Sequence, residues 1–217
     1  MWQLVRKMAV HETATARITV DLAPESFGIC ALEAPEFGAS LTLPRNRRRL
    51  RLVEPGAPLK DLYIRGDDVV ASYAPAGDRV SYQVYWRSLE TEPGRAAIGV
   101  ELIVSAQTDH LEAEPAAVVK SDFPNGASLA GGGWILVPSE NESYVELADV
   151  SHHQASELKT MPDDSATLTH QLFPGKLEKG VIRRARLRAF ILPAATDAQR
   201  VEELYAAFIG SALPLTT

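Results

Sequence analysis

Hydrophobic and polar residues alternate with a period of two along much of the chain, the pattern of β-strands with one buried face. The clearest segment is 80–87, followed by a turn signal at Glu92-Pro93-Gly94 and a second alternating segment, 98–104. The two segments predict a long hairpin with an apolar and a polar side. Its expected core-facing residues are Val80, Tyr82, Val84, Trp86, Ile98, Val100, Leu102 and Val104.

Further alternating segments predict additional strands, separated by turn residues such as Pro55-Gly56, Pro124-Asn125-Gly126 and Pro174-Gly175. These strands are expected at 17–22, 49–53, 61–65, 68–73, 134–137, 144–150, 167–173 and 181–192. About ten short strands at this spacing are typical of a β-sandwich or barrel rather than of βαβ units. The least regular stretch, 107–133, is rich in Ala, Glu, Pro, Ser and Gly and is expected to be a long, mobile loop.

One amphipathic helix is expected at about 197–210. Thr196-Asp197-Ala198-Gln199 matches a capping box led by Thr196, and Gly210 followed by Pro214 provides the stop signal. The apolar stripe of this helix consists of Val201, Leu204, Tyr205, Phe208 and Ile209. The sequence therefore predicts an all-β, mainly antiparallel, sandwich- or supersandwich-like domain over residues 1–217, with one C-terminal α-helix packed on a sheet.

Composition supports a globular protein, since 46% of the 217 residues are hydrophobic and 23% are charged. The single cysteine, Cys30, lies in an apolar run and is expected to be a small buried side chain rather than a nucleophile. Residues 1–8 carry charges where a signal peptide needs an apolar stretch, and no segment approaches the ~20 apolar residues of a membrane span. We therefore expect a soluble, cytoplasmic protein without a membrane partner.

The net charge of −6 argues against a general nucleic-acid partner, which requires a positive field. The basic run from Arg45 to Arg51 is a local exception. It is interpreted as a solvated loop entering a strand, with its arginines paired with the surplus carboxylates; a phosphate or anion patch is the alternative.

Specific catalytic and ligand-binding motifs are absent from the sequence: no nucleophile elbow, phosphate-binding loop, dinucleotide fingerprint or zinc signature occurs. We therefore expect no metal and no cofactor. Among the histidines, His170 shares a strand face with leucines and is expected to be a hydrogen-bonded core residue, whereas His152 and His153 point to opposite sides if extended. A loop pair at His152 and His153 that holds a ligand is the alternative.

Two candidate sites remain. In Asp109-His110-Leu111-Glu112, an extended chain places His110 and Glu112 on one side, where an imidazole and a carboxylate would serve as a catalytic acid–base pair. A surface pair at a strand exit is the alternative.

The second candidate is a ligand-binding surface on the polar side of the long strands. Alternation places Arg184, Arg186 and Arg188 on one face, and the hairpin presents Tyr85, Arg87 and Glu101. If these strands share a sheet, guanidinium forks, a ring and a carboxylate would suit an anionic or hydroxyl-rich small molecule. The alternative is a solvated face with cross-strand Arg–Glu pairs.

Several segments resemble a family of bacterial proteins of uncharacterised function. These are Leu172-Phe173-Pro174-Gly175 through Arg186, Leu192-Pro193, Tyr85-Trp86-Arg87 and Val100–Thr108. Long alternating strands with one helix are also similar to the galactose-mutarotase-like β-supersandwich, a fold that implies sugar epimerases or carbohydrate-binding modules. The mutarotase signature, a His-Pro-Tyr-Phe-like stretch followed by a second histidine, is absent, so no catalytic residue is transferred.

Three functional hypotheses follow. The first is a binding module for a carbohydrate or small anionic metabolite on the polar face. The second is a mutarotase-like or lyase-type sugar enzyme that uses His110 and Glu112. The third is a protein-interaction or scaffolding domain, including a homodimer paired through edge strands or through the helix.

Overall fold

The protein is described by a computed structural model that covers residues 1–35, 38–45, 47–53, 58–75, 80–89, 98–123, 129–151 and 153–212. Its largest sheet has eight strands in the order β13-β14-β15-β19-β10-β9-β8-β7. These strands are β7 (Leu59–Arg65), β8 (Asp68–Tyr73), β9 (Val80–Leu89), β10 (Ile98–Thr108), β13 (Leu129–Ala130), β14 (Trp134–Pro138), β15 (Glu142–Ala148) and β19 (Ile182–Pro193).

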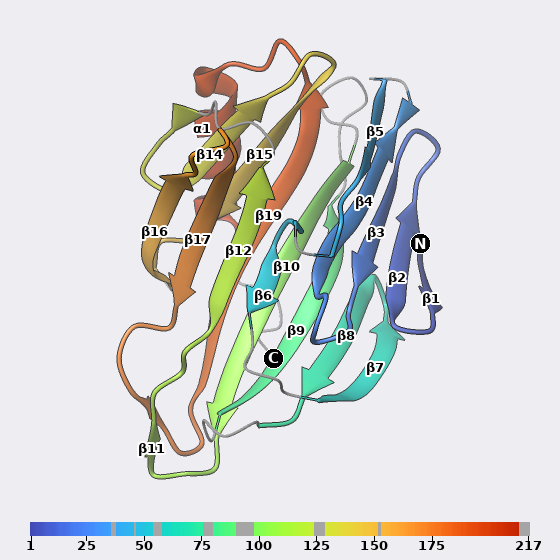
Figure 1. Cartoon of the computed structure of the whole chain (residues 1–217). Helices are drawn as coiled ribbons and strands as arrows, with labels where there is room; N and C mark the ends of the chain where they lie inside the picture. Colours follow the sequence, from blue (N-terminus) through green and yellow to red (C-terminus); the bar gives the residue numbers. More distant parts are fainter. Residues whose placement is uncertain are drawn as a thin grey trace.

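Two smaller sheets lie side by side against one face of the eight-stranded sheet (Figure 1). The five-stranded sheet contains β1 (Trp2–Val5), β2 (Met8–Glu12), β3 (Arg17–Asp21), β4 (Gly28–Ala34) and β5 (Ala39–Thr42). The four-stranded sheet has the order β16 (His153–Thr160), β17 (Ala166–Leu172), β12 (Val118–Phe123) and β6 (Arg51–Val53). A two-stranded ribbon, β11 (Glu112–Ala113) with β18 (Leu177–Glu178), extends from one end.

Every described strand pair is antiparallel, and one α-helix, α1 (Ala198–Gly210), follows β19. The expected all-β sandwich with a C-terminal helix is confirmed. The predicted hairpin is β9 with β10, and its apolar side faces the core, as Trp86 and Leu102 show by their complete burial. The same core contains Ile18 of the five-stranded sheet and Phe123 of the four-stranded sheet, so all three sheets share it.

The two smaller sheets meet where the Ile29 amide donates to the Arg49 carbonyl at 2.9 Å. Gly28 makes this approach feasible, because an added Cβ would lie 2.7 Å from the Arg49 oxygen and its φ is +123°. The basic run differs only in part from the expected solvated loop. The expected carboxylate pairs form, from Arg47 to Asp163 at 3.4 Å and from Arg51 to Asp122 at 3.8 Å, but the middle of the run is not solvated. Arg48 donates to the carbonyls of Leu43 and Cys30, and both Arg48 and Arg49 are buried.

The expected long loop at 107–133 is also wrong, because it contains β12, which pairs with both β17 and β6. Burial alternates along β12: Val119, Ser121 and Phe123 are buried, whereas Lys120 and Asp122 between them are half-buried on the opposite face. This is the alternation of a β-strand in a short polar segment. Residues 124–128 of this stretch lie outside the described residues, as does His152 of the alternative His152–His153 ligand pair.

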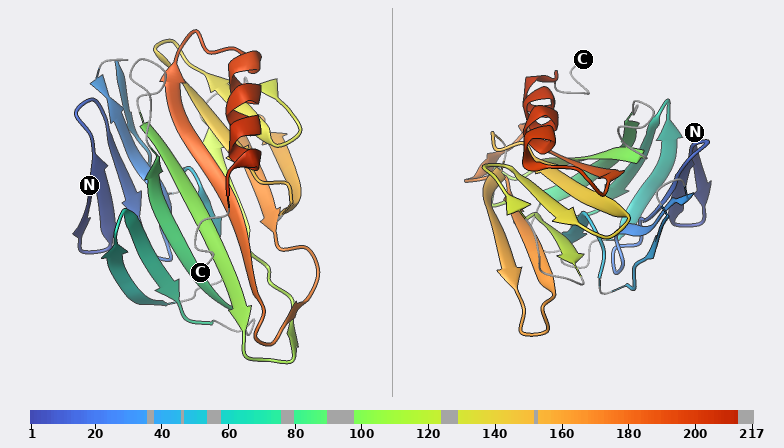
Figure 2. Two further views of the ribbon diagram at one scale, coloured as in Figure 1. Left: turned by 180° about the vertical axis from the view of Figure 1, so that it is seen from behind. Right: turned by 90° about the horizontal axis from the view of Figure 1, so that it is seen from above.

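Helix α1 lies on the opposite face of the eight-stranded sheet from the two smaller sheets, over β14, β15 and β19 (Figure 2). Val201 and Phe208 of its predicted stripe are completely buried there, against Leu136, Val145 and Leu147 of the sheet. The N-cap is Asp197 rather than the expected Thr196, since the Asp197 carboxylate accepts the third residue's amide at 2.9 Å. The described part of the chain contains no helix long and apolar enough to cross a membrane.

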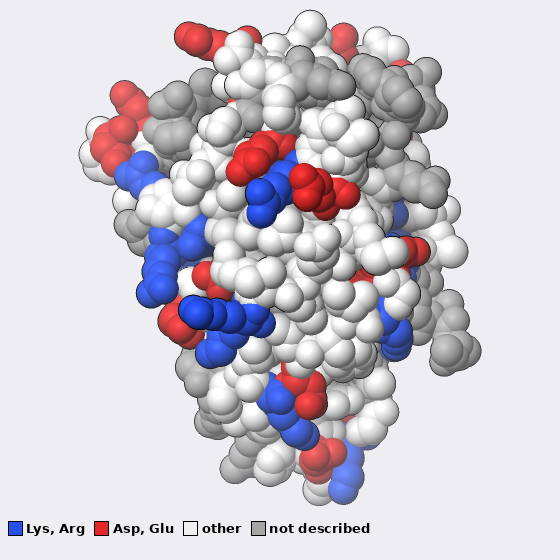
Figure 3. All heavy atoms as spheres, turned by 90° about the vertical axis from the view of Figure 1, so that its right-hand side faces the viewer, with Lys and Arg blue, Asp and Glu red and all other residues white. Residues whose placement is uncertain are grey.

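Charged side chains on the right-hand side of Figure 1 form small groups separated by uncharged surface, and several of these groups contain both signs (Figure 3). On this face, the described residues therefore present no extended field of one sign.

Candidate functional site

Three neighbouring strands, β9, β10 and β19, carry the predicted polar residues on one face. Glu101 of β10 lies directly opposite Arg87 of β9 on one side and Arg188 of β19 on the other. The polar sides of the hairpin and of β19 therefore belong to one sheet, as the ligand-binding hypothesis required. They lie on the side that carries α1, beside the area that the helix covers.

Paired charges form one row across this face. Asp68 of β8 accepts two hydrogen bonds from Arg87, at 2.7 and 2.9 Å, and Glu101 accepts from Arg188 at 2.9 Å. The hydrogen bond to Asp68 raises the pKa of Arg87. Cross-strand Arg–carboxylate pairs were the expected alternative for this face, yet Glu101 is only 1% exposed and is not solvated. The two arginines and two carboxylates of this row neutralise each other's charge.

Arg186 was predicted to bind the ligand, but its contacts hold the C-terminal end of α1 against the sheet instead. It is buried, donates to Asp149 at 2.8 Å, and reaches the Ser211 hydroxyl and the Ala212 carbonyl beyond the helix end. Its guanidinium also lies over the Phe208 ring, at 4.8 Å from the centroid. Because these partners occupy its donors, we place Arg186 outside the candidate binding surface.

Tyr85 is also more enclosed than an open stacking platform. It packs with Val70 and Ile103 and is 7% exposed, and its hydroxyl donates to the Gln83 side chain. Burial raises the pKa of Tyr85. The Arg65 guanidinium lies 5.5 Å from the centre of its ring. Tyr85 therefore orients Gln83 rather than presenting a bare aromatic face.

A pair of incompletely satisfied polar groups lies in the next row of the sheet. Ser105 of β10 is opposite both Gln83 and Arg184. The Ser105 hydroxyl and the Arg184 Nε are buried, and neither has a hydrogen-bond partner among the residues that the structure describes. A buried polar group without a partner costs about 1–3 kcal/mol. These two groups therefore define the part of the polar face with hydrogen-bonding capacity left for a ligand.

The polar-face candidate site is defined here as Gln83, Tyr85, Ser105 and Arg184, bordered by the paired row with Arg87, Glu101 and Arg188. Sequence reasoning missed Ser105, although the signal was available. Ser105 has the same parity as Glu101 and Ile103, but the predicted strand was ended at Val104, four residues before the end of β10 at Thr108.

The predicted acid–base pair lies elsewhere. His110 follows β10 in an exposed bend, where its amide donates to the Thr108 hydroxyl at 3.1 Å. Glu112 is on the ribbon strand β11, with a side chain 60% exposed and paired with Lys176 at 2.7 Å. This placement matches the surface-pair alternative, so His110 and Glu112 are left out of the candidate site.

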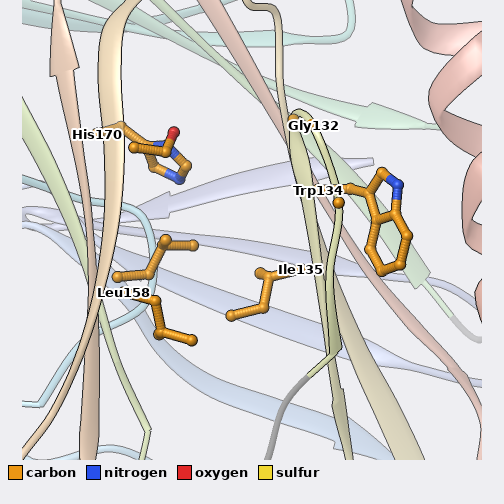
Figure 4. A pocket seen from close by; sticks show the side chains of 9 residues that line it. Gly132, Trp134, Ile135, Leu158 and His170 are labelled. Carbon is orange, nitrogen blue, oxygen red and sulfur yellow. The ribbon is translucent and has the colours of Figure 1, made fainter.

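A separate cavity of about 310 Å3 lies between the sandwich layers, at the end formed by β14, β16 and β17. Gly132 and Ile135 face it from one side and Leu158 and His170 from the other, whereas the Trp134 indole projects away toward α1 (Figure 4). His170 is buried and hydrogen-bonded, as expected from the sequence. The described residues contain no group of three or more His, Cys, Asp or Glu arranged to hold a metal ion.

Comparison with solved structures supports the fold. A protein from Klebsiella pneumoniae subsp. pneumoniae MGH 78578, provisionally assigned as an aldose 1-epimerase, matches with a TM-score of 0.56 and 9% identity, over 97% of this chain and 87% of that one. A provisionally assigned kojibiose phosphorylase from the human microbiome matches with a TM-score of 0.42 and 8% identity, over 96% of this chain and 28% of that one. No family model and no curated protein matches the sequence. The Klebsiella match shows that the chain has the galactose-mutarotase-like β-supersandwich fold.

Proposed function

We propose that the protein binds a carbohydrate or a small anionic carbohydrate derivative at the polar-face site. The observation that carries this proposal is the pair formed by buried Ser105 and half-buried Arg184: the Ser105 hydroxyl and the Arg184 Nε–H lack partners among the described residues. A hydroxyl and a guanidinium in adjacent positions match a ligand that offers oxygen acceptors and hydroxyl donors.

The surrounding residues support a preorganised surface. Gln83 donates to the Ser72 hydroxyl at 2.9 Å and accepts from Tyr85, so its amide orientation is held before a ligand arrives. The bidentate Arg87–Asp68 pair holds the neighbouring row. Sites with side chains locked by such contacts lose less conformational entropy on binding.

The fold is consistent with a sugar ligand, because the neighbour from Klebsiella is named as acting on an aldose. Fold and function are separable, so this similarity raises the expectation of a sugar without locating a site.

The test is a thermal-shift screen of neutral sugars, sugar acids and sugar phosphates, followed by calorimetric titration of each compound that shifts the melting temperature. Losing one hydrogen bond to a charged group costs about 1.5–3 kcal/mol, so Arg184→Ala is expected to weaken binding by about 10- to 100-fold. Arg183→Ala is the matched control: Arg183 is the preceding residue of β19, and its guanidinium donates to the Pro174 carbonyl instead.

If Arg183→Ala and Arg184→Ala reduce the melting-temperature shift equally, the ligand does not bind at this surface. If no compound in any of the three classes produces a shift, the proposal fails, and the interaction-domain hypothesis becomes the better account.

A further inference from the structure

Three residues from three strands form a continuous hydrogen-bonded chain at the interlayer cavity. The Ser156 hydroxyl on β16 lies 2.7 Å from His170 Nδ1 on β17, and His170 Nε2 lies 2.9 Å from a carboxylate oxygen of Glu146 on β15. Ser156 and His170 are directly opposite in the register of the four-stranded sheet, whereas Glu146 reaches them from the eight-stranded sheet. This geometry joins a hydroxyl, an imidazole and a carboxylate in one line.

The carboxylate of this chain is fixed and ionised. Glu146 is 1% exposed, and its other oxygen accepts from Ser121 and from Tyr144, each at 2.6 Å. Burial alone would raise its pKa, but the hydrogen bonds from His170, Ser121 and Tyr144 hold the pKa of Glu146 below its ordinary value. A carboxylate at Nε2 requires a proton on that nitrogen, so the neutral ring offers its Nδ1 lone pair to Ser156.

In this hydrogen-bonded chain, the serine end is the one that solvent can reach. Ser156 is exposed even though it is directly opposite the buried His170. Both residues line the 310 Å3 cavity together with Ile135, Leu158 and Leu168. A cavity of this size and mixed lining fits a small molecule with a compact apolar group. The glycine segment 131–133 lines the same cavity, and a Cβ added to Gly132 would meet nothing within 4 Å, so its backbone is open to close approach.

We propose that Ser156 is an activated nucleophile that cleaves small esters with compact apolar acyl groups. The Ser156 oxygen forms a bond to the ester carbonyl carbon while its proton passes to His170 Nδ1, and the carbon–oxygen bond to the alcohol breaks as His170 returns that proton to the departing alcohol. Water then attacks the acyl carbon and loses a proton to His170. The bond between the acyl carbon and the Ser156 oxygen breaks as His170 returns that proton to the serine, which releases the carboxylic acid and the free serine. Ser156 and His170 are the catalytic residues, and Glu146 is a positioning residue that fixes the ring and its protonation. The two ring nitrogens exchange roles relative to the common arrangement: here the serine contacts Nδ1 and the carboxylate contacts Nε2, whereas the serine usually contacts Nε2.

The experiment treats the intact protein with a small alkyl fluorophosphonate and maps the modified residue by mass spectrometry. The serine oxygen displaces fluoride from phosphorus, so the adduct remains on the attacking residue. We expect one adduct, on Ser156, with a labelling rate that rises through a single ionisation and then levels off as the pH increases. Removing a general base typically slows such a step by 10²–10⁴-fold, so His170→Gln is expected to reduce the rate by about 100-fold or more.

Ser165→Ala is the matched control, because Ser165 lies half-buried in the β16–β17 turn and donates to the Asp163 carboxylate at 2.5 Å without joining the Ser156–His170–Glu146 chain. Ser156→Ala must abolish the adduct while Ser165→Ala leaves it unchanged. If His170→Gln does not fold, the pH profile of the unmodified protein remains the test, since a serine without a base reacts in proportion to hydroxide and shows no plateau. An unlabelled Ser156 in the folded protein, or labelling that does not level off, overturns the proposal. The polar-face ligand screen is independent of this outcome, since the two sites share no residue.

Discussion

The Arg186–Asp149 pair supports the docking of α1. Breaking this pair is therefore expected to cause the largest loss of stability among the variants considered. Both side chains are nearly inaccessible, at 2% and 6% exposure, and Arg186 also binds the Ser211 hydroxyl at the helix end. Arg186→Met would leave the Asp149 charge without its guanidinium partner. Removing one partner of a buried pair costs about 3–5 kcal/mol, which is a large part of the 5–15 kcal/mol that stabilises a typical protein.

The assay is urea unfolding of the wild type, Arg186→Met, Asp149→Asn and the double variant, followed by circular dichroism. Because the two residues interact directly, the double variant should lose less than the sum of the two single losses. Arg183→Met is the matched control: the Arg183 guanidinium donates to the exposed Pro174 carbonyl, so a loss below about 1 kcal/mol is expected. A loss below about 1 kcal/mol for Arg186→Met, or fully additive effects, would refute the assigned support role.

The pair also predicts a pH dependence. Burial would raise the pKa of Asp149, but hydrogen bonds from Ser151 and Arg186 hold it below its ordinary value. Its stabilisation is therefore complete above the ordinary carboxyl pKa and is lost as the pH falls through the lower folded-state value. Asp149→Asn lacks this titration, so the stability difference between it and the wild type should shrink in acid. A difference that stays constant across that range would contradict the argument.

Two further predictions concern α1. An added Cβ at Gly133 would lie 2.2 Å from the Tyr205 hydroxyl, so Gly133→Ala should lower the free energy of urea unfolding by about 1–3 kcal/mol. Adding Tyr205→Ala to that variant should restore part of the loss. An unchanged free energy of unfolding in Gly133→Ala would contradict the close packing. Asp197→Ala should cost about 1 kcal/mol by removal of the cap, and an equal loss from Asp197→Asn, which retains a capping oxygen, would show that the cap is not the cause.

The elements that the sequence predicted well depend on local periodicity. The β9–β10 hairpin and the helix stripe could be recognised because each buries a face that repeats along the chain, at a period of two for Trp86 and Leu102 and of about 3.6 for Val201 and Phe208. The polar residues Arg87 and Glu101 followed from the same alternation. The pairing of Glu101 with Arg188 required the additional fact that β19 lies beside β10.

What the sequence could not predict depends on contacts between distant segments. The sequence places Arg49 in a basic run and so predicts that it faces solvent. In the structure its guanidinium is buried, 3.9 Å from the centre of the Phe123 ring, and Phe123 belongs to the segment expected to be a loop. Arg186 has the same alternation parity as Arg184, and only the position of the helix end separates their roles. The chain through Ser156, His170 and Glu146 joins two sheets, so no spacing along the sequence marks it.

The most direct test of the polar-face site is an NMR titration that follows the Nε–Hε resonance of Arg184, assigned by its disappearance in Arg184→Ala. The proposed function predicts that a carbohydrate or small anionic carbohydrate derivative shifts this resonance in a saturable way, while the resonance of Arg183, on the other side of β19, stays in place. Saturable binding that leaves the Arg184 resonance unmoved would contradict the assignment of the ligand to this surface.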